Sequence, residues 1–295
     1  MKVTTRTRRV PGKRGRRAAR RRGERGVALI LVLWVLALLA VLAVSFAGGA
    51  RTELKIARNQ YEAARAEAIA DAGVTFGILG ALDPAPQTHW TPDGERHELA
   101  YGEGALGVSV EDEGGKVDLN AGAPELLAGL LRRLGVAEDA ARQVLDGILQ
   151  RRRDALAAGN GVLAFRDVAE LRLVPGMARP LYQALVPLVT VYNRNDRIDP
   201  LSAPPEVLRS LPGVAAAQVE AYLAARASAG AQPTALPPLA GADRFVAHSA
   251  LQVITIRSEG WTPGGGRFVR EAVVALSGTP PYRFLAWRQG ESAAP

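Results

Sequence analysis

The chain has 295 residues, a net charge of +8 and no cysteine, which allows one or two domains with a hydrophobic core and excludes a disulfide-stabilised scaffold. The charge is concentrated at one end, because residues 1–26 hold 12 of the 37 Lys and Arg residues and one of the 29 acidic residues. The remainder carries 25 basic and 28 acidic residues, a net charge of −3, which argues against a phosphate-binding surface spread over the whole chain.

An apolar run follows the basic leader. Val27–Ala50 contains no charged side chain, and as a helix it is about 36 Å long, enough to cross a hydrocarbon core of about 30 Å. Because the basic residues precede this run, the leader is predicted to stay in the cytoplasm and the C-terminal part to be exported. Two alternatives remain open, an uncleaved anchor or cleavage after Gly26 that leaves the apolar run attached.

The next segment, Arg51–Leu82, is rich in strong helix formers, so one helix of more than 50 residues is predicted from the apolar run onward. Asp83-Pro84-Ala85-Pro86 is expected to end it. Six apolar residues recur at spacings of three and four, which predicts a stripe that packs against a sheet or neighbouring helices. These residues are Leu54, Ala57, Tyr61, Ala64, Ala68 and Ala72.

Strand patterns occur in two separate parts of the chain. A hairpin is predicted in residues 97–113, with its turn at Gly102-Glu103-Gly104. Three further strands, Leu251–Arg257, Phe268–Leu276 and Tyr282–Trp287, are predicted to form an antiparallel meander. The expected fold class is α+β, a long N-terminal helix packed on an antiparallel β-sheet that a large all-α insert, residues 116–240, interrupts in the sequence.

The insert contains two pairs of similar stretches. Val117–Leu127 resembles Ile198–Leu208, and in each a polar residue, Asn120 or Ser202, precedes a Pro-Glu pair in the manner of a helix N-terminal cap. The turns Leu173-Val174-Pro175-Gly176-Met177 and Ser210-Leu211-Pro212-Gly213-Val214 resemble those of helix-hairpin-helix modules.

Such hairpins bind DNA phosphate through closely approaching backbone N–H groups, which needs glycine. Ala178 and Ala215 stand where a second glycine would support this function, so structural hairpins are favoured over nucleic-acid binding. The cluster Arg151-Arg152-Arg153 is interpreted as a solvated helix end.

No catalytic constellation is recognisable. His89, His97 and His248 share no metal-ligand spacing, and there is no nucleophile elbow, P-loop or dinucleotide fingerprint. Glu111-Asp112-Glu113 offers oxygen atoms to Ca²⁺, but without a regular ligand spacing a solvated turn is favoured. Asp196, Arg197 and Asp199 are interpreted as loop charges. We therefore expect a protein that is not an enzyme, with no small-molecule substrate and no required cofactor.

Gly26 resembles a type IV prepilin cleavage site, in which a basic leader ends in glycine and the mature N-terminus begins a hydrophobic helix. Together with the stem helix, the C-terminal meander and the insert, residues 22 to about 289 resemble the protein K family of the general secretion pathway, minor pseudopilins of type II secretion systems. The most specific parts are the junction through Asn59, Val117–Asn120 and Pro187–Leu208.

The resemblance implies a pilin fold in five parts. These are a cleaved leader (1–26), the transmembrane half of the long helix (27–50), the stem and first strands (51–115), the insert (116–240) and the C-terminal strands (241–295). It also implies that a prepilin peptidase cuts between Gly26 and Val27 and methylates the new amine. The processed protein would sit in the bacterial inner membrane, single-pass, with its globular part in the periplasm.

The resemblance further implies a position in the filament. Most pilins carry glutamate at the fifth mature residue, where this chain has Leu31. A carboxylate in the span costs about 2.5–3.5 kcal/mol unless it is paired, and in the filament it pairs with a neighbour's N-terminal amine. A subunit without it is expected at the tip, where it initiates assembly with other minor pseudopilins and the major pseudopilin.

Two alternatives have different consequences. A membrane-anchored helix-hairpin-helix DNA receptor of a competence system predicts a retained leader, an uncut Gly26 and duplex binding by residues 116–240. A signal-anchored periplasmic enzyme predicts an activity that depends on a buried carboxylate or histidine.

Overall fold

The computed structural model describes residues 24–85, 87–159, 161–229, 236–248 and 253–290. The basic leader up to Gly23, Pro86 at the predicted helix stop and the predicted strand start at Leu251 lie outside these residues. The chain divides into two compact units, residues 1–60 and residues 61–295.

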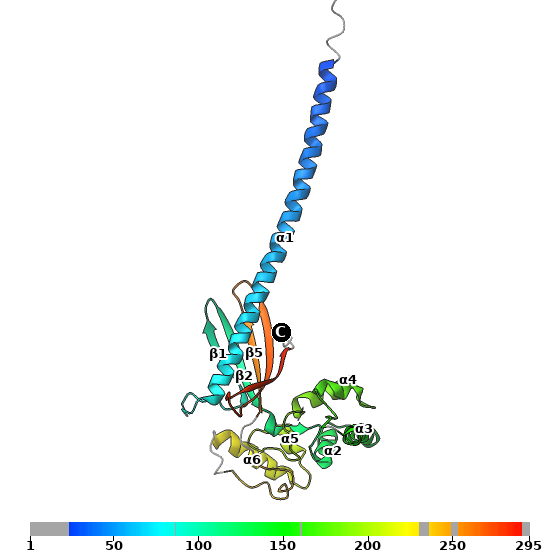
Figure 1. The fold of residues 1–295 in the computed structure, drawn as a ribbon, viewed down its shortest axis with the longest axis vertical. Coiled ribbons are helices and arrows are strands. Elements are labelled where there is room, and N and C mark those ends of the chain that lie inside the picture. Colours follow the sequence, from blue (N-terminus) through cyan, green and yellow to red (C-terminus); the bar gives the residue numbers. More distant parts are fainter. Residues whose placement is uncertain (1–23, 86, 160, 230–235, 249–252, 291–295) are drawn as a thin grey trace, which may run out of the picture. The chain divides into compact units, whose positions relative to one another are not determined.

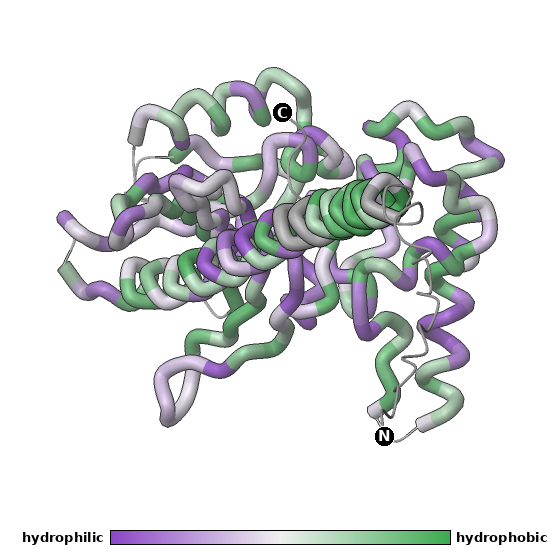
Figure 2. The backbone as a smooth tube through the Cα atoms, turned by 90° about the horizontal axis from the view of Figure 1, so that it is seen from above, coloured by the Kyte–Doolittle hydropathy of each residue, from purple (hydrophilic) through white to green (hydrophobic). Residues whose placement is uncertain are grey.

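The first unit contains the start of helix α1, which runs from Glu24 to Leu82 over 59 residues and confirms the predicted long helix. Within it, Gly26–Ser45 is long and apolar enough to cross a membrane, with a mean hydropathy of 3.2. None of these 20 residues is buried, and Figure 2 shows the segment as a continuous hydrophobic run of helix. Length and composition therefore fit a single membrane-spanning segment.

The second unit contains an antiparallel five-stranded sheet of order β1-β2-β5-β6-β7 (Figure 1). Its strands are β1 (Asp93–Tyr101), β2 (Gly104–Asp112), β5 (Val253–Trp261), β6 (Arg267–Ala275) and β7 (Arg283–Gln289). The hairpin and the C-terminal meander are confirmed, and β5 runs on past Arg257 to Trp261. Strands β2 and β5 are neighbours in the sheet although the insert separates them in sequence.

The end of α1 packs on one face of this sheet, but not through the predicted stripe. Leu54 and Tyr61 are 70% and 61% exposed, and none of the six stripe residues is buried. The opposite side of the helix is buried instead, against side chains such as Val108 and Ile256. The buried residues are Ala66, Ile69, Ala70, Gly73, Val74, Gly77, Ile78, Gly80 and Ala81.

Small residues decide which side packs. A Cβ atom at Gly77 would lie 2.7 Å from Ile256 Cγ2, and one at Gly73 would overlap Ser258 Oγ. The helix backbone therefore approaches the sheet more closely than any larger residue permits. The sequence pattern was ambiguous because both sides of α1 carry small apolar residues at helical spacing.

The insert has its own hydrophobic core, separate from the core between α1 and the sheet. Its helices are α2 (Pro124–Arg133), α3 (Glu138–Ala158), α4 (Arg179–Leu185), α5 (Pro205–Arg209) and α6 (Ala216–Ala229), with 3-10 turns η2 (Val168–Leu173) and η3 (Val186–Leu188). Two short parallel strands, β3 (Val117–Asp118) and β4 (Val189–Thr190), pair the start of the insert with its middle. Ala242 and Phe245 are buried in this core, so the insert continues beyond the expected limit at residue 240.

The predicted caps are wrong. The residues at the N-terminal caps of α2 and α5 are Ala123 and Pro204, and neither makes a side-chain cap bond. Asn120 instead exchanges two hydrogen bonds, of 2.9 and 2.8 Å, with the backbone of Phe165. The turns before the helices are closed by Asp118, which accepts from Asn120 N at 2.7 Å, and by Asp199, which accepts from Leu201 N at 3.0 Å.

The helical hairpins are present, and there is one more than the sequence indicated. Gly176 and Gly213 have φ of +82° and +77°, as their turns require. Gly135, between α2 and α3, has φ of +73° and forms a third turn of this kind. It was missed because no proline precedes it.

An arginine from a helix holds the loop that precedes the helix within each of the two similar stretches. Arg152 of α3 and Arg226 of α6 each donate to three backbone carbonyl oxygens, at 2.7–3.2 Å. The acceptors are Asp118, Leu119 and Gly122 for Arg152, and Pro200, Leu201 and Ala203 for Arg226. The interpretation of Arg152 as part of a solvated helix end is therefore wrong, because its guanidinium satisfies the carbonyls of a tight loop.

We expect Arg152→Met to lower the free energy of unfolding by about 2–3 kcal/mol, since it leaves partly buried carbonyl oxygens without donors. Arg153→Met is the matched control on the same helix, because Arg153 is exposed and bonds only to Gln150 among the contacts described for its side chain. Urea denaturation monitored by circular dichroism measures both. Equal effects of the two substitutions would contradict the role of Arg152.

Candidate functional site

The first candidate site is the start of α1, which holds the three residues singled out from the sequence. Val27 and Leu31 are 65% and 61% exposed, and among the described residues no atom beyond the neighbouring part of the helix lies within 4 Å of a Cβ position at Gly26. The Gly26–Val27 peptide bond lies in the first turns of α1, at the edge of the hydrophobic run. All three residues are thus on a surface that another protein or a lipid can cover, and Leu31 offers no charge there.

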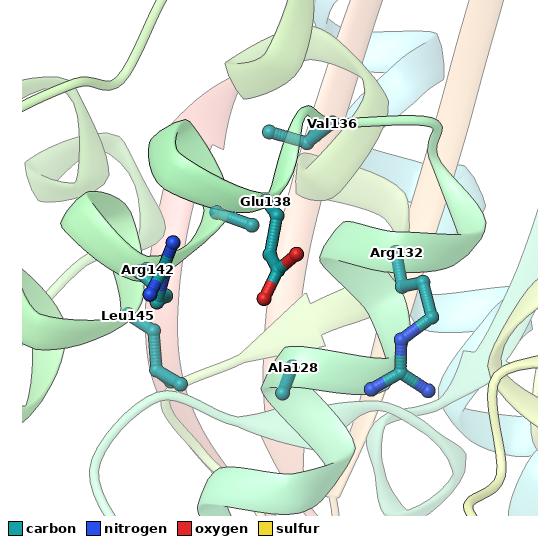
Figure 3. A pocket seen from close by; sticks show the side chains of 7 residues that line it. Ala128, Arg132, Val136, Glu138, Arg142 and Leu145 are labelled. Carbon is teal, nitrogen blue, oxygen red and sulfur yellow. The ribbon is translucent and has the colours of Figure 1, made fainter.

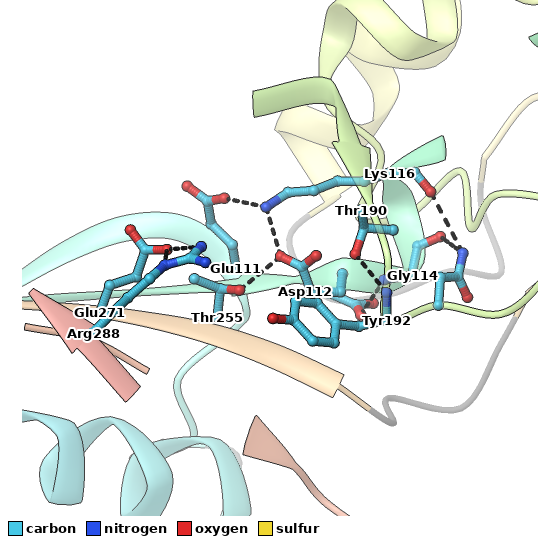
Figure 4. Close-up of polar contacts among 11 residues, drawn as sticks. Glu111, Asp112, Gly114, Lys116, Thr190, Tyr192, Thr255, Glu271 and Arg288 are labelled. Carbon is cyan, nitrogen blue, oxygen red and sulfur yellow. Dashed lines mark hydrogen bonds and ion pairs between the residues drawn. The ribbon is translucent and has the colours of Figure 1, made fainter. Parts of the chain in front are cut away.

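The second candidate site is a polar junction where β2 enters the insert through a 3-10 turn, η1 (Glu113–Gly115) (Figure 4). Lys116 Nζ lies 2.7 Å from Glu113 Oε1 and 3.0 Å from Glu111 Oε2, and Thr255 Oγ1 donates to Glu113 Oε1 at 2.7 Å. Glu113 is 4% exposed and Lys116 is 8% exposed. The expectation of a solvated turn is therefore wrong, because the last residue of this acidic run belongs to a buried ion pair.

The charges of this pair hold each other in the ionised state. Burial opposes the charge on Lys116, but attraction to Glu113 and Glu111 raises its pKa above the ordinary value. Burial likewise works against ionised Glu113, and the Lys116 charge with the hydrogen bonds of Lys116 and Thr255 brings the pKa of Glu113 below the ordinary value. Both groups are ionised at neutral pH, so the junction depends on their pairing.

Two more carboxylates at this junction are buried. Asp112 accepts from Gly114 N at 2.8 Å, and burial, with the nearby charges of Asp199 and Glu113, raises its pKa. Asp199 is 4% exposed and lies 3.5 Å from His248 Nδ1, so this loop charge is buried. In the part of the chain that the structure describes, no group of three or more His, Asp or Glu residues is arranged to hold a metal ion.

Further contacts fix the insert to the sheet. Arg288 of β7 bonds Glu271 on β6 at 2.5 Å and Asp167 of the insert at 3.0 Å. Gly114 O accepts from the backbone N–H of Asp199 at 2.9 Å and from the side chain of Asn193 at 3.2 Å. Ion pairs and backbone hydrogen bonds between the sheet and the insert thus fix the position of the insert.

A hollow of about 360 Å³ lies at the hairpin of α2 and α3 (Figure 3). Glu138 projects into it with Arg132 on one side and Arg142 on the other, above an apolar lining that includes Leu145. Glu138 and Asp139 occupy the first turn of α3, where negative charge opposes a phosphate group at the helix start.

The histidines have three different surroundings. His89 Nδ1 lies 3.1 Å from Asp83 O, His97 stacks on Trp90 with ring centroids 4.0 Å apart, and His248 lies beside Asp199. The structure does not bring them together.

Comparison with known proteins identifies the fold. No protein-family model matches the chain, and no curated protein matches it. A solved structure that does match is the crystal structure of the GspK–GspI–GspJ complex from the type 2 secretion system of enterotoxigenic Escherichia coli, with a TM-score of 0.54 and 19% sequence identity. The match covers 82% of this chain and 99% of that chain.

The fold is pilin-like, with a helical insert. The predicted α+β class and the predicted arrangement of helix, antiparallel sheet and all-α insert are thereby confirmed. At 19% identity the likeness concerns the fold, so the roles of Gly26, Val27 and Leu31 stay predictions.

Proposed function

We propose that this protein is a minor pseudopilin of a type II secretion system and stands at the tip of the pseudopilus. The observation that carries the proposal is the likeness to a chain of a secretion-system complex over 99% of that chain, insert included. The exposed apolar segment Gly26–Ser45 supports it, because a helix of this kind needs a membrane or other helices around it.

The tip position rests on Leu31. A pilin-type filament that holds buried carboxylates needs an amine from the adjacent subunit for each one. With leucine at this position the apolar segment needs no amine from an adjacent subunit, since Val27–Ala50 has no charged side chain. The subunit therefore fits the first place in the filament, where it initiates assembly and supports export of folded proteins across the outer membrane.

The proposed partners follow from this position. They are two other minor pseudopilins in the tip complex, the major pseudopilin below it and the prepilin peptidase that processes the precursor. The protein acts in the inner membrane, with its sheet and insert in the periplasm. Its work is mechanical and structural, without a small-molecule substrate, nucleic acid or required cofactor.

Processing is the first test. The full chain is co-expressed with an active prepilin peptidase, and intact mass spectrometry locates the N-terminus. We expect nearly complete cleavage that leaves an N-methylated Val27 as the first residue. Gly26→Leu is expected to abolish cleavage, since the peptidase must accommodate the residue before the cut.

Gly23→Leu is the matched control, three residues upstream in the leader, and it should be processed like the native chain. A catalytically inactive peptidase should leave the N-terminus at Met1. An N-terminus at Met1 under active peptidase would contradict the proposal. If that uncut protein also bound duplex DNA in a gel shift, the competence receptor would take its place.

A further inference from the structure

Strand β7 forms one edge of the sheet and, among the described residues, pairs with β6 alone. Four large side chains within residues 282–287 are exposed, by 36% (Tyr282), 44% (Phe284), 37% (Leu285) and 44% (Trp287). The opposite edge, β1, carries Asp93, Glu95, Arg96, His97 and Glu98, and such charges discourage pairing with another chain. The two edges therefore differ, and β7 is the one suited to a partner.

The aromatic rings at this edge hold one another in place. Tyr282 and Phe284 are edge-to-face with centroids 5.7 Å apart, and Phe284 and Trp287 likewise at 5.1 Å. The Arg270 guanidinium lies 5.1 Å from the Trp287 ring and is itself bonded to Glu67 and Asp71 of α1, each at 2.6 Å. Because the rings are already held in place, they lose little conformational entropy when a partner covers them, and this favours binding.

The two faces of β7 differ in chemistry. Phe284 pairs with Val274 and Trp287 with Ala272, which are buried in the core under α1, so the aromatic rings belong to that face. Arg283 pairs with Ala275 and Arg288 with Glu271, on the other face. Arg288 is already bonded to Glu271 and Asp167, whereas no hydrogen bond or ion pair engages Arg283 within the described residues.

We propose that β7 is a docking edge for an extended strand of a partner protein, apolar on the face that meets Phe284 and Trp287 and acidic on the face that meets Arg283. Backbone hydrogen bonds to the open edge supply affinity, and the two faces set the orientation and the choice of partner. The acidic requirement follows from Arg283, because it is the cation of this edge whose charge is not already compensated.

A second copy of the chain fits this edge less well. The other edge of the five-stranded sheet is β1, where Glu98 shares a face with Arg96 and lies 3.5 Å from it. Arg96 also pairs with Glu259, so this face of β1 offers no net negative charge to Arg283. The partner is therefore a different protein. This inference does not rest on the proposed function, since cleavage after Gly26 and strand binding are measured separately.

The test uses the full chain in detergent micelles and a fluorescein-labelled nonapeptide of alternating Glu and Val residues, followed by fluorescence anisotropy. The matched probe alternates Lys and Val. We expect saturable binding of the acidic peptide, at least tenfold tighter than the basic one, and slower amide hydrogen exchange within residues 283–289. Arg283→Glu should reverse the preference, and Trp287→Ala should weaken binding of the acidic peptide at least tenfold.

Arg153→Glu on α3 is the control, an exposed arginine away from the sheet, and it should leave binding unchanged. Arg283 is exposed, so its substitution should not disturb folding, and a thermal melt checks Trp287→Ala. Equal binding of both peptides, or unchanged exchange within residues 283–289, would overturn the proposal. Self-association in sedimentation that Arg283→Glu abolishes would overturn it too, in favour of a second copy.

Discussion

Lys116→Met is expected to lower the free energy of unfolding by about 3–5 kcal/mol, because it leaves the Glu113 carboxylate buried without its cation. Lys116 Nζ and Glu113 Oε1 are 2.7 Å apart at the junction of sheet and insert, and both residues are less than 10% exposed. Urea denaturation at neutral pH measures the effect. It is the largest loss that we expect from removing one charge in the described part of the chain.

The double variant Lys116→Met/Glu113→Gln tests the cause. Glutamine removes the buried charge and keeps an oxygen that accepts from Thr255 Oγ1, so most of the lost stability should return. Arg166→Met replaces an exposed cation elsewhere in the insert and should change stability by less than about 0.5 kcal/mol. If the double variant were as unstable as Lys116→Met, the packing of the lysine chain and not its charge would be responsible.

The pH dependence of the Lys116→Met effect has a definite sign. In the native protein the pKa of Glu113 lies below its ordinary value of 4.5, so its pairing contributes stability above that value and loses it as the pH falls through the folded-state pKa. In the Lys116→Met variant, burial destabilises the Glu113 carboxylate and no cation compensates for this. Lowering the pH protonates the carboxylate and so removes the free-energy cost of a buried charge. The difference in stability between the two proteins should therefore shrink as the pH falls from 7 to 4.

Gly73→Leu is expected to cost about 3 kcal/mol or more, because the side chain has no space between α1 and the sheet. A Cβ atom at this position already overlaps Ser258 Oγ and lies 3.0 Å from Val108 Cγ2. The higher helix propensity of leucine, worth about 1 kcal/mol over glycine, does not offset this. Thermal and urea denaturation measure the change, and Ala68→Leu on the opposite, exposed side of α1 is the control.

A smaller substitution isolates the contact. Ser258 is fully buried and its hydroxyl has no hydrogen-bond partner in the described structure, so Ser258→Ala should be neutral or stabilising. Gly73→Ala should destabilise the native protein, and combining it with Ser258→Ala should recover part of the loss. Strictly additive effects of the two substitutions would show that the helix can shift away from the sheet.

The elements that the sequence predicted correctly are those with a local signal. The long helix, the hairpin turn at Gly102 and the three C-terminal strands each follow from hydropathy, periodicity or turn residues within a short segment. The third hairpin turn at Gly135 was missed, although its Gly-Val pair matches Gly213-Val214 in the later turn. A glycine without a preceding proline is a weaker sequence signal for a turn, but this signal is present at Gly135.

The amino-acid sequence by itself determined where the apolar segment begins, that α1 is long and that a helical insert splits a sheet, because these properties depend on neighbouring residues. The tertiary structure alone decided which side of α1 packs, since both sides carry small apolar residues. It also decided the state of Glu113, whose partner Thr255 is 142 positions away, and of Arg288, whose partner Asp167 is 121 away. Such contacts form between elements that the fold brings together, and no local pattern encodes them.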